Sequence, residues 1–107
     1  EPSGAEVEAR WVRLGDALGF TGITVSRQMH EARIHVHDAA RTGLVIAASG
    51  DGHMTGAPDL LMAVTVADCV PVYLVDPAER VAALLHAGWR GVAAGILERA
   101  FEALGES

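Results

Sequence analysis

Three apolar runs in the second half of the chain do most to limit how it can fold. They cover residues 60–69 (LLMAVTVADC), 70–76 (VPVYLVD) and 81–87 (VAALLHA). Continuous apolar runs of this length are typical of strands that are buried on both faces. Because only short turns separate the runs, we expect their strands to pair in an antiparallel or mixed sheet.

Two amphipathic segments predict helices that would pack on this sheet. Apolar residues recur at helical spacing over residues 4–18 and again over residues 89–104. Together with the strands, they predict an α/β (α+β) layered sandwich in which helices pack on a mixed, largely antiparallel sheet. We expect residues 1–107 to form a single domain. Because the chain lacks an initiator Met and stops directly after a helical pattern, we expect it to be incomplete at both ends.

The segment between the first helix and the apolar runs contains shorter elements. Residues 22–29 and 33–37 alternate, with a bias toward β-branched residues, which predicts two strands of the same sheet. Residues 43–48 form a further short apolar run. Residues 49–59 (SGDGHMTGAPD) are rich in turn-forming residues, so we expect a loop that can approach a ligand.

The composition excludes several classes of protein. The net charge is −6 and the basic residues are all arginines, which argues against sequence-independent nucleic-acid binding. No apolar run approaches the roughly 20 residues that span a bilayer. One cysteine cannot form an internal disulfide, and no signal peptide is visible at the amino end. We therefore expect a cytoplasmic protein that does not associate with membranes.

A thiol and an imidazole stand at the ends of two of the apolar runs. Cys69 closes the run 60–69, and His86 lies near the end of the run 81–87. Side chains at neighbouring strand ends would suit either a metal site or a Cys–His nucleophile. A third metal ligand would come from one of the remaining histidines, and spacing alone does not choose among them. They are His30, His35, His37 and His53.

A glycine-rich turn follows His86 and opens the predicted second helix. Gly88 and Gly91 flank Trp89 and Arg90. A helix start of this kind offers free backbone amides that suit an anion such as phosphate, and Arg90 could add a guanidinium. The alternative is that the glycines only permit a tight turn while Trp89 packs into the core.

Several motifs resemble the YfiH/laccase-domain family, whose members are described as multicopper polyphenol oxidases and as purine nucleoside phosphorylases. The segment AVTVADCVPVYLVD and the later LLHAGWRG carry the resemblance most strongly. SRQMHEARIHV is similar to the family's Q-V-H-G segment, SGDGHMT to its D-A-L-V-T segment, and EVEARWVRL to its V-x-x-N-R-x-x-L helix. The resemblance covers nearly the whole chain and implies a YfiH-like fold.

The resemblance implies a site with one metal ion, reported as zinc or copper. Its ligands would be His30, Cys69 and His86, which makes His30 the third ligand. Asp51 and Asp68 stand at motif positions and are candidates for acid–base groups beside these ligands, and a second set of residues is expected to contact substrate or phosphate. The catalytic candidates are Cys69, His86, Asp68 and Asp51; the binding candidates are Arg90, Gln28 and Arg10.

The chain also departs from the family pattern. Ala9 replaces the Asn of the N-R pair, Glu31 the Gly after the Q-x-H histidine, and His53 the Leu of D-A-L-V-T. The family's carboxy-terminal motifs G-P-x-I and C-Y-E-V are absent. His53 belongs to a segment that could line the pocket.

The activity implied by the resemblance is metal-dependent phosphorolysis of adenosine, inosine or methylthioadenosine, with adenosine deamination as a second activity. A copper-dependent polyphenol oxidase is a competing hypothesis, which we disfavour because one His–Cys–His set supplies one metal ion whereas multicopper oxidation needs more. Two further hypotheses are a Cys–His hydrolase with Cys69 as nucleophile, and an inactive fragment that only binds metal. The sequence gives no indication of the oligomeric state.

Overall fold

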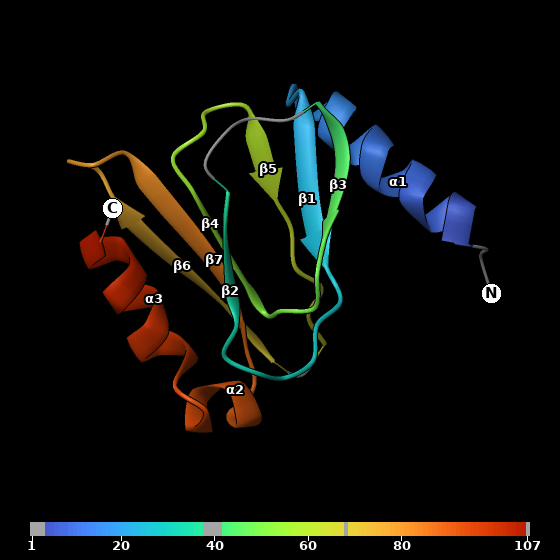
Figure 1. Ribbon diagram of the computed structural model, residues 1–107. Coiled ribbons are helices and arrows are strands. Elements are labelled where there is room, and N and C mark those ends of the chain that lie inside the picture. Colours follow the sequence, from blue (N-terminus) through green and yellow to red (C-terminus); the bar gives the residue numbers. More distant parts are fainter. Residues whose placement is uncertain (1–3, 38–41, 68, 107) are drawn as a thin grey trace.

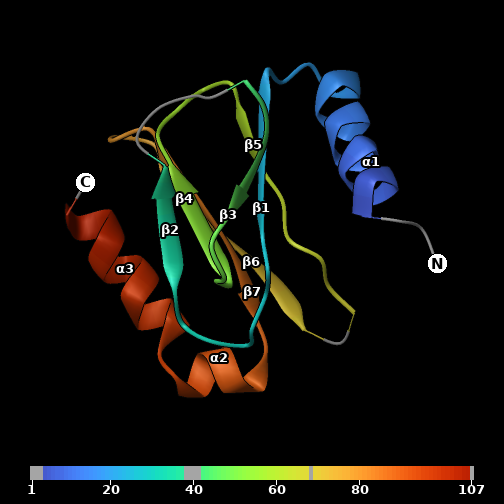
Figure 2. The same cartoon turned by 45° about the vertical axis from the view of Figure 1, so that its right-hand side comes forward.

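The computed structural model describes residues 4–37, 42–67 and 69–106, which form helices around two β-sheets (Figures 1 and 2). The elements are α1 (Gly4–Ala17), β1 (Gly22–Ser26), β2 (Ile34–His37), β3 (Gly43–Ala47), β4 (Gly52–Thr55), β5 (Leu60–Met62), β6 (Val70–Asp76), β7 (Val81–Ala87), α2 (Trp89–Ala93) and α3 (Ile96–Glu106). Within the described part of the chain, no helix is long and apolar enough to cross a membrane.

The smaller sheet has the strand order β3-β1-β5, and both pairings are parallel. Helix α1 packs beside it, on the side away from the larger sheet (Figure 1). Gly15 is the buried residue of this helix, and a Cβ atom there would lie 3.5 Å from the side chain of Ile23. A Cβ atom would thus make only an ordinary van der Waals contact there, and Gly15 marks the place where the helix meets the central strand β1.

The larger sheet has the strand order β2-β4-β7-β6. Strands β2 and β4 run parallel, whereas β7 is antiparallel to both β4 and β6. Helix α3 packs against this sheet at its β2 and β7 strands (Figure 2). Ile96 and Ala100, one helical turn apart, are fully buried with Leu85 of β7, and this cluster forms the main hydrophobic core.

The predicted mixed α/β architecture is confirmed, together with the first helix and the strands β6 and β7. These elements have long, regular apolar patterns, so the sequence alone locates them well. The strands predicted over 22–29, 33–37 and 60–66 exist but are shorter. The sequence predicts one central, largely antiparallel sheet, whereas the structure has two sheets, because β1 pairs with β3 and β5 rather than with β2. Among the described residues, three of the five strand pairings are parallel, and β5 lies in a different sheet from β6 and β7.

Two predictions about local structure are wrong. The predicted loop 49–59 contains the strand β4, and all four of its residues are buried. Its Gly52 serves close packing, because a Cβ atom would lie 2.8 Å from Cδ2 of Leu85. The predicted helix over 89–104 is two helices, broken where Gly95 adopts a φ of +92° that non-glycine residues rarely adopt.

We expect Leu85→Ala to destabilise the fold by about 2–5 kcal/mol, because it removes buried methyl groups and leaves a cavity at the core. Leu18→Ala removes the same atoms from a side chain that is 57% exposed, so its effect should stay below about 1 kcal/mol. Urea denaturation of both variants measures the difference. Equal losses for the two variants would contradict this assignment of the core.

Candidate metal centre

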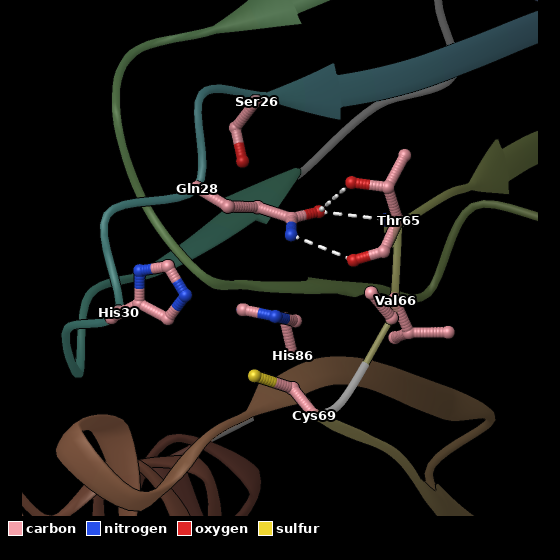
Figure 3. Close-up of a pocket in the computed structure, with 8 residues that line it drawn as sticks. Ser26, Gln28, His30, Thr65, Val66, Cys69 and His86 are labelled. Carbon is pink, nitrogen blue, oxygen red and sulfur yellow. Dashed lines mark hydrogen bonds between the residues drawn. The ribbon is translucent and has the colours of Figure 1, made fainter.

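His30, Cys69 and His86 converge from three separate segments onto one pocket (Figure 3). His30 lies in the loop after β1, Cys69 directly precedes β6, and His86 lies near the end of β7. One potential ligand atom from each lies within 4.8 Å of the other two. Among the described residues, this is the one group of three or more His, Cys, Asp or Glu side chains close enough to hold a metal ion.

The pairing of β6 with β7 brings Cys69 and His86 together. In this antiparallel pair Val70 lies opposite Ala87 and Pro71 opposite His86, so Cys69 comes next to Gly88. A Cβ atom on Gly88 would lie 2.8 Å from the Cys69 sulfur. Glycine at this position therefore leaves the space that the thiol needs, and the sequence-based expectation that both side chains lie at neighbouring strand ends agrees with this arrangement.

The loop that carries His30 is held by one buried carboxylate. Asp51 accepts hydrogen bonds from the backbone N–H groups of Met29 (2.8 Å), His30 (2.9 Å) and Glu31 (3.1 Å). His30 has a φ of +60°, which is strained for a residue with a side chain. The three amide bonds to Asp51 stabilise this turn and so fix the position of His30.

The same carboxylate orients the second histidine. Nδ1 of His86 donates to Oδ2 of Asp51 at 2.7 Å, and both side chains are buried. With Nδ1 donating to Asp51, the ring can present Nε2 to a metal ion, as is common for histidine ligands paired with a carboxylate. Burial alone would raise the pKa of Asp51, but the hydrogen bonds from His86 and the loop amides outweigh it and hold that pKa below its ordinary value.

Gln28 ties the two ligand-bearing loops together. Its Nε2 donates to the carbonyl oxygen of Thr65 at 2.8 Å, and its Oε1 accepts from the Thr65 amide at 2.7 Å (Figure 3). The Thr65 hydroxyl adds a bond of 3.3 Å to the same oxygen. Gln28 precedes His30 by two residues and Thr65 precedes Cys69 by four, so this clamp links the two segments that carry these ligands.

The structure does not bring all of the predicted site residues to the pocket. Arg10 lies on α1 and is exposed, and Arg90 is also exposed, with its guanidinium carbon 5.3 Å from the ring centre of Trp89. Neither arginine is among the residues that line the pocket. Trp89 is 77% exposed, so the prediction that it could pack into the core is wrong. Asp68 lies outside the described residues.

Asp51, a predicted catalytic residue, is fully buried and does not line the pocket. The bonds to His86 and to the His30 loop give it a role in positioning the ligands. Sequence reasoning identifies Asp51 through a motif resemblance but misses this connection, since it depends on contacts between residues more than 20 positions apart.

A second polar group lies behind the pocket wall, and sequence reasoning misses it. His53 is fully buried in β4, with Nδ1 3.0 Å from Nε2 of His37 and Nε2 3.2 Å from Oγ of Ser26. Burial, and then the nearby His37 and His35, lower the pKa of His53 from its ordinary 6.5 to about 4. The alternation of histidines in β2 is a usable signal, but the strand that pairs with it is predicted as a loop.

We expect Asp51→Asn to weaken metal binding by roughly 10- to 100-fold, because an amide cannot accept both from the loop amides and from His86 as a carboxylate does. Competition with a chromophoric chelator measures the affinity. Asp59→Asn, at an exposed position, is the matched control and should bind as the unmodified protein does. Equal affinities for all three proteins would rule out the positioning role.

The depressed pKa of His53 makes stability depend on pH. The unfolded chain binds a proton at this histidine below about pH 6.5, whereas the folded protein binds it only near pH 4, so stability falls as the pH drops through that window. The groups that face His53 are His37 and His35 of β2 and Ser26 of β1, while Leu84 lies opposite it on β7.

We expect the unmodified protein to lose about 3 kcal/mol more than His53→Leu when the pH falls from 7 to 4. Urea unfolding of both proteins in metal-free buffer, at several pH values in this range, measures the difference. Parallel curves for the two proteins would show that folding does not lower the pKa of His53.

Comparisons with known proteins bear on this site. Residues 3–107 match the model of the family described as multi-copper polyphenol oxidoreductase laccase. A Mycobacterium tuberculosis protein named purine nucleoside phosphorylase is 37% identical over 102 residues, covering 94% of this chain and 40% of its own length. A protein from an unknown prokaryotic organism, named adenosine deaminase RL5, is 35% identical over 86 residues, covering 75% of this chain and 33% of its own length.

The fold agrees with these sequence relationships. The crystal structure of YfiH from Bacillus licheniformis superposes with a TM-score of 0.67 at 32% identity, covering 86% of this chain and 38% of that one. The chain thus spans about 40% of the length of the curated relatives that it matches most fully. Because the family model matches nearly every residue, the chain belongs to the family of multi-copper polyphenol oxidoreductase laccases, the YfiH/laccase-domain family.

Proposed function

We propose that the chain carries the metal centre of a purine nucleoside phosphorylase, an enzyme that cleaves the N-glycosidic bond of a purine nucleoside with phosphate. The observation that carries this proposal is the convergence of His30, Cys69 and His86 on one wall of a cavity of about 480 Å³. This volume lies in the range of small-molecule sites. Relatives named purine nucleoside phosphorylase support the choice of substrate.

The donor set favours zinc as the resident metal, with copper as the alternative. Two imidazole nitrogens and one thiolate are ligands that zinc prefers, and three protein ligands are typical of catalytic rather than structural zinc sites. The space left by Gly88 and the free Nε2 of His86 fit such an ion. Zinc bound there would supply a Lewis acid with an open coordination position, lowering the pKa of a bound water to about 7.

The residues of the chain would prepare the pocket for substrate. Asp51 keeps a proton on Nδ1 of His86 and holds the His30 loop, while the clamp between Gln28 and Thr65 closes the opposite wall. We also propose Asp68 as an acid–base group and Arg90 as a contact for phosphate. Arg90 suits phosphate better than Arg10, because it lies only two residues after Gly88, where an added Cβ atom would lie 2.8 Å from the Cys69 sulfur.

Two further activities are candidates. Adenosine deamination is favoured by the relative named adenosine deaminase, and it would release ammonia without consuming phosphate. A Cys–His hydrolase is favoured by the bond from His86 to Asp51, which resembles the base–carboxylate pair of such enzymes. Alkylation of Cys69 that abolished turnover but left the metal bound would favour the hydrolase. Phenol oxidation is the least supported, because the described residues offer a single three-ligand group.

We expect the protein to convert adenosine or inosine to free base and ribose 1-phosphate only when phosphate is present. Alanine replacement of His30, Cys69 or His86 should lower both metal content and turnover by more than about 100-fold, since each removes a ligand. His35→Ala is the matched control, because this histidine bonds to the carbonyl oxygens of Ala48 and Ser49 instead.

Chromatography of the products, with metal analysis of each variant, performs this test. Turnover that survives in all three ligand variants would overturn the proposal. Inosine and ammonia formed from adenosine without phosphate would establish deamination in its place.

A further inference from the structure

A chain of polar side chains leads from the larger sheet to the wall of the pocket. It runs from His37 through the fully buried His53 to Ser26, which lines the pocket at the end of β1. Figure 3 shows the Ser26 hydroxyl pointing from β1 toward the pocket, on the same side as Gln28. None of these three residues belongs to the metal-binding group, and Ser26 is not among the predicted site residues.

The contacts, together with the neutral state of His53, give a direction to each hydrogen bond in this series. Ser26 donates its one hydroxyl proton to the carbonyl oxygen of Gly50 at 2.7 Å, because a carbonyl can only accept. The contact of 3.2 Å between Ser26 Oγ and His53 Nε2 therefore has the ring nitrogen as its donor. A buried, neutral His53 has one ring proton, so with that proton on Nε2 its Nδ1 accepts from Nε2 of His37 at 3.0 Å.

This arrangement leaves the Ser26 hydroxyl with one unused lone pair, which can accept one further hydrogen bond. Of the two lone pairs on its oxygen, one accepts from His53, and the proton is committed to Gly50. Toward the pocket, Ser26 can therefore only accept a hydrogen bond. The bond from His53 also polarises the hydroxyl, which strengthens its bond to the Gly50 carbonyl.

We propose that Ser26 is a substrate-binding residue that accepts a hydrogen bond from an O–H or N–H group of the bound nucleoside, and that His53 fixes this polarity. The inference rests on the proposed nucleoside substrate. A nucleoside offers two kinds of donor, the ribose hydroxyls and the exocyclic amino group of adenine. Because Ser26 can only accept a hydrogen bond from the ligand, the pocket discriminates against nucleoside analogues that lack the donor group facing it.

The first measurement tests the polarity without any substrate. Long-range proton–nitrogen correlation spectra of the zinc-loaded, ¹⁵N-labelled protein report which ring nitrogen of each histidine carries the proton, and His53→Leu assigns the signal. We expect His53 to be neutral and protonated on Nε2 at pH 7. A proton on Nδ1, or a doubly protonated ring, would overturn the inference.

The second measurement identifies the donor. Calorimetric titration compares adenosine with 2′-deoxyadenosine, 3′-deoxyadenosine, 5′-deoxyadenosine and purine riboside, which lacks the amino group. We expect Ser26→Ala to weaken adenosine binding roughly three- to tenfold, as the loss of one hydrogen bond does. The analogue that lacks the contacting donor should bind Ser26→Ala and the unmodified protein equally.

Ser26→Thr keeps the hydroxyl and should retain more adenosine affinity than Ser26→Ala. Ser49→Ala, outside the pocket lining, is the matched control and should bind adenosine normally. If Ser26→Ala binds every nucleoside as the unmodified protein does, or weakens all of them equally, the inference fails while the proposed function stands. If the unmodified protein binds no nucleoside, the proposed function fails, and the tautomer of His53 alone decides the polarity of Ser26.

Discussion

The metal-binding group depends on the buried carboxylate of Asp51. Four N–H groups, from Met29, His30, Glu31 and His86, converge on its two oxygens within 3.1 Å. An ionised carboxylate is costly to bury unless hydrogen bonds compensate it, and here the pKa of Asp51 stays below its ordinary value despite burial. Three of these partners belong to the loop after β1, and the fourth is His86 on β7 of the larger sheet. The Asp51 side chain therefore couples the positions of the two ligands His30 and His86.

The backbone around Asp51 adds a further link. The amide of His86 donates to the carbonyl oxygen of Asp51 at 2.6 Å, where β4 and β7 begin to pair. The third ligand reaches the same place because β6 pairs with β7, and Gly88 leaves room for its sulfur. The centre is thus built mainly on strands of the larger sheet, with His30 supplied by a loop that Asp51 and the Gln28 clamp hold in place. Sites supported in this way keep their geometry before a ligand arrives.

Two buried histidines of this protein illustrate how environment sets the role of one residue type. His86 faces a carboxylate, which fixes its proton on Nδ1 and leaves Nε2 for a metal ion. Among the described residues, the polar groups beside His53 are histidines and a hydroxyl, so burial keeps it neutral and it orders a series of hydrogen bonds instead. The first arrangement suits chemistry at a metal centre, and the second suits recognition at the wall beside it.

The sequence by itself determined the helix α1, the strands β6 and β7 and the closeness of Cys69 to His86, because regular apolar patterns and adjacent strand ends are local properties. The choice of His30 came from motif resemblance, since spacing left four histidines open. Tertiary structure alone decided that Gly52 lies in a buried strand, that Asp51 positions two ligands, and that His53 contacts Ser26. Each of these depends on burial or on contacts between residues that lie more than 15 positions apart, and such contacts leave no periodic signal in the chain.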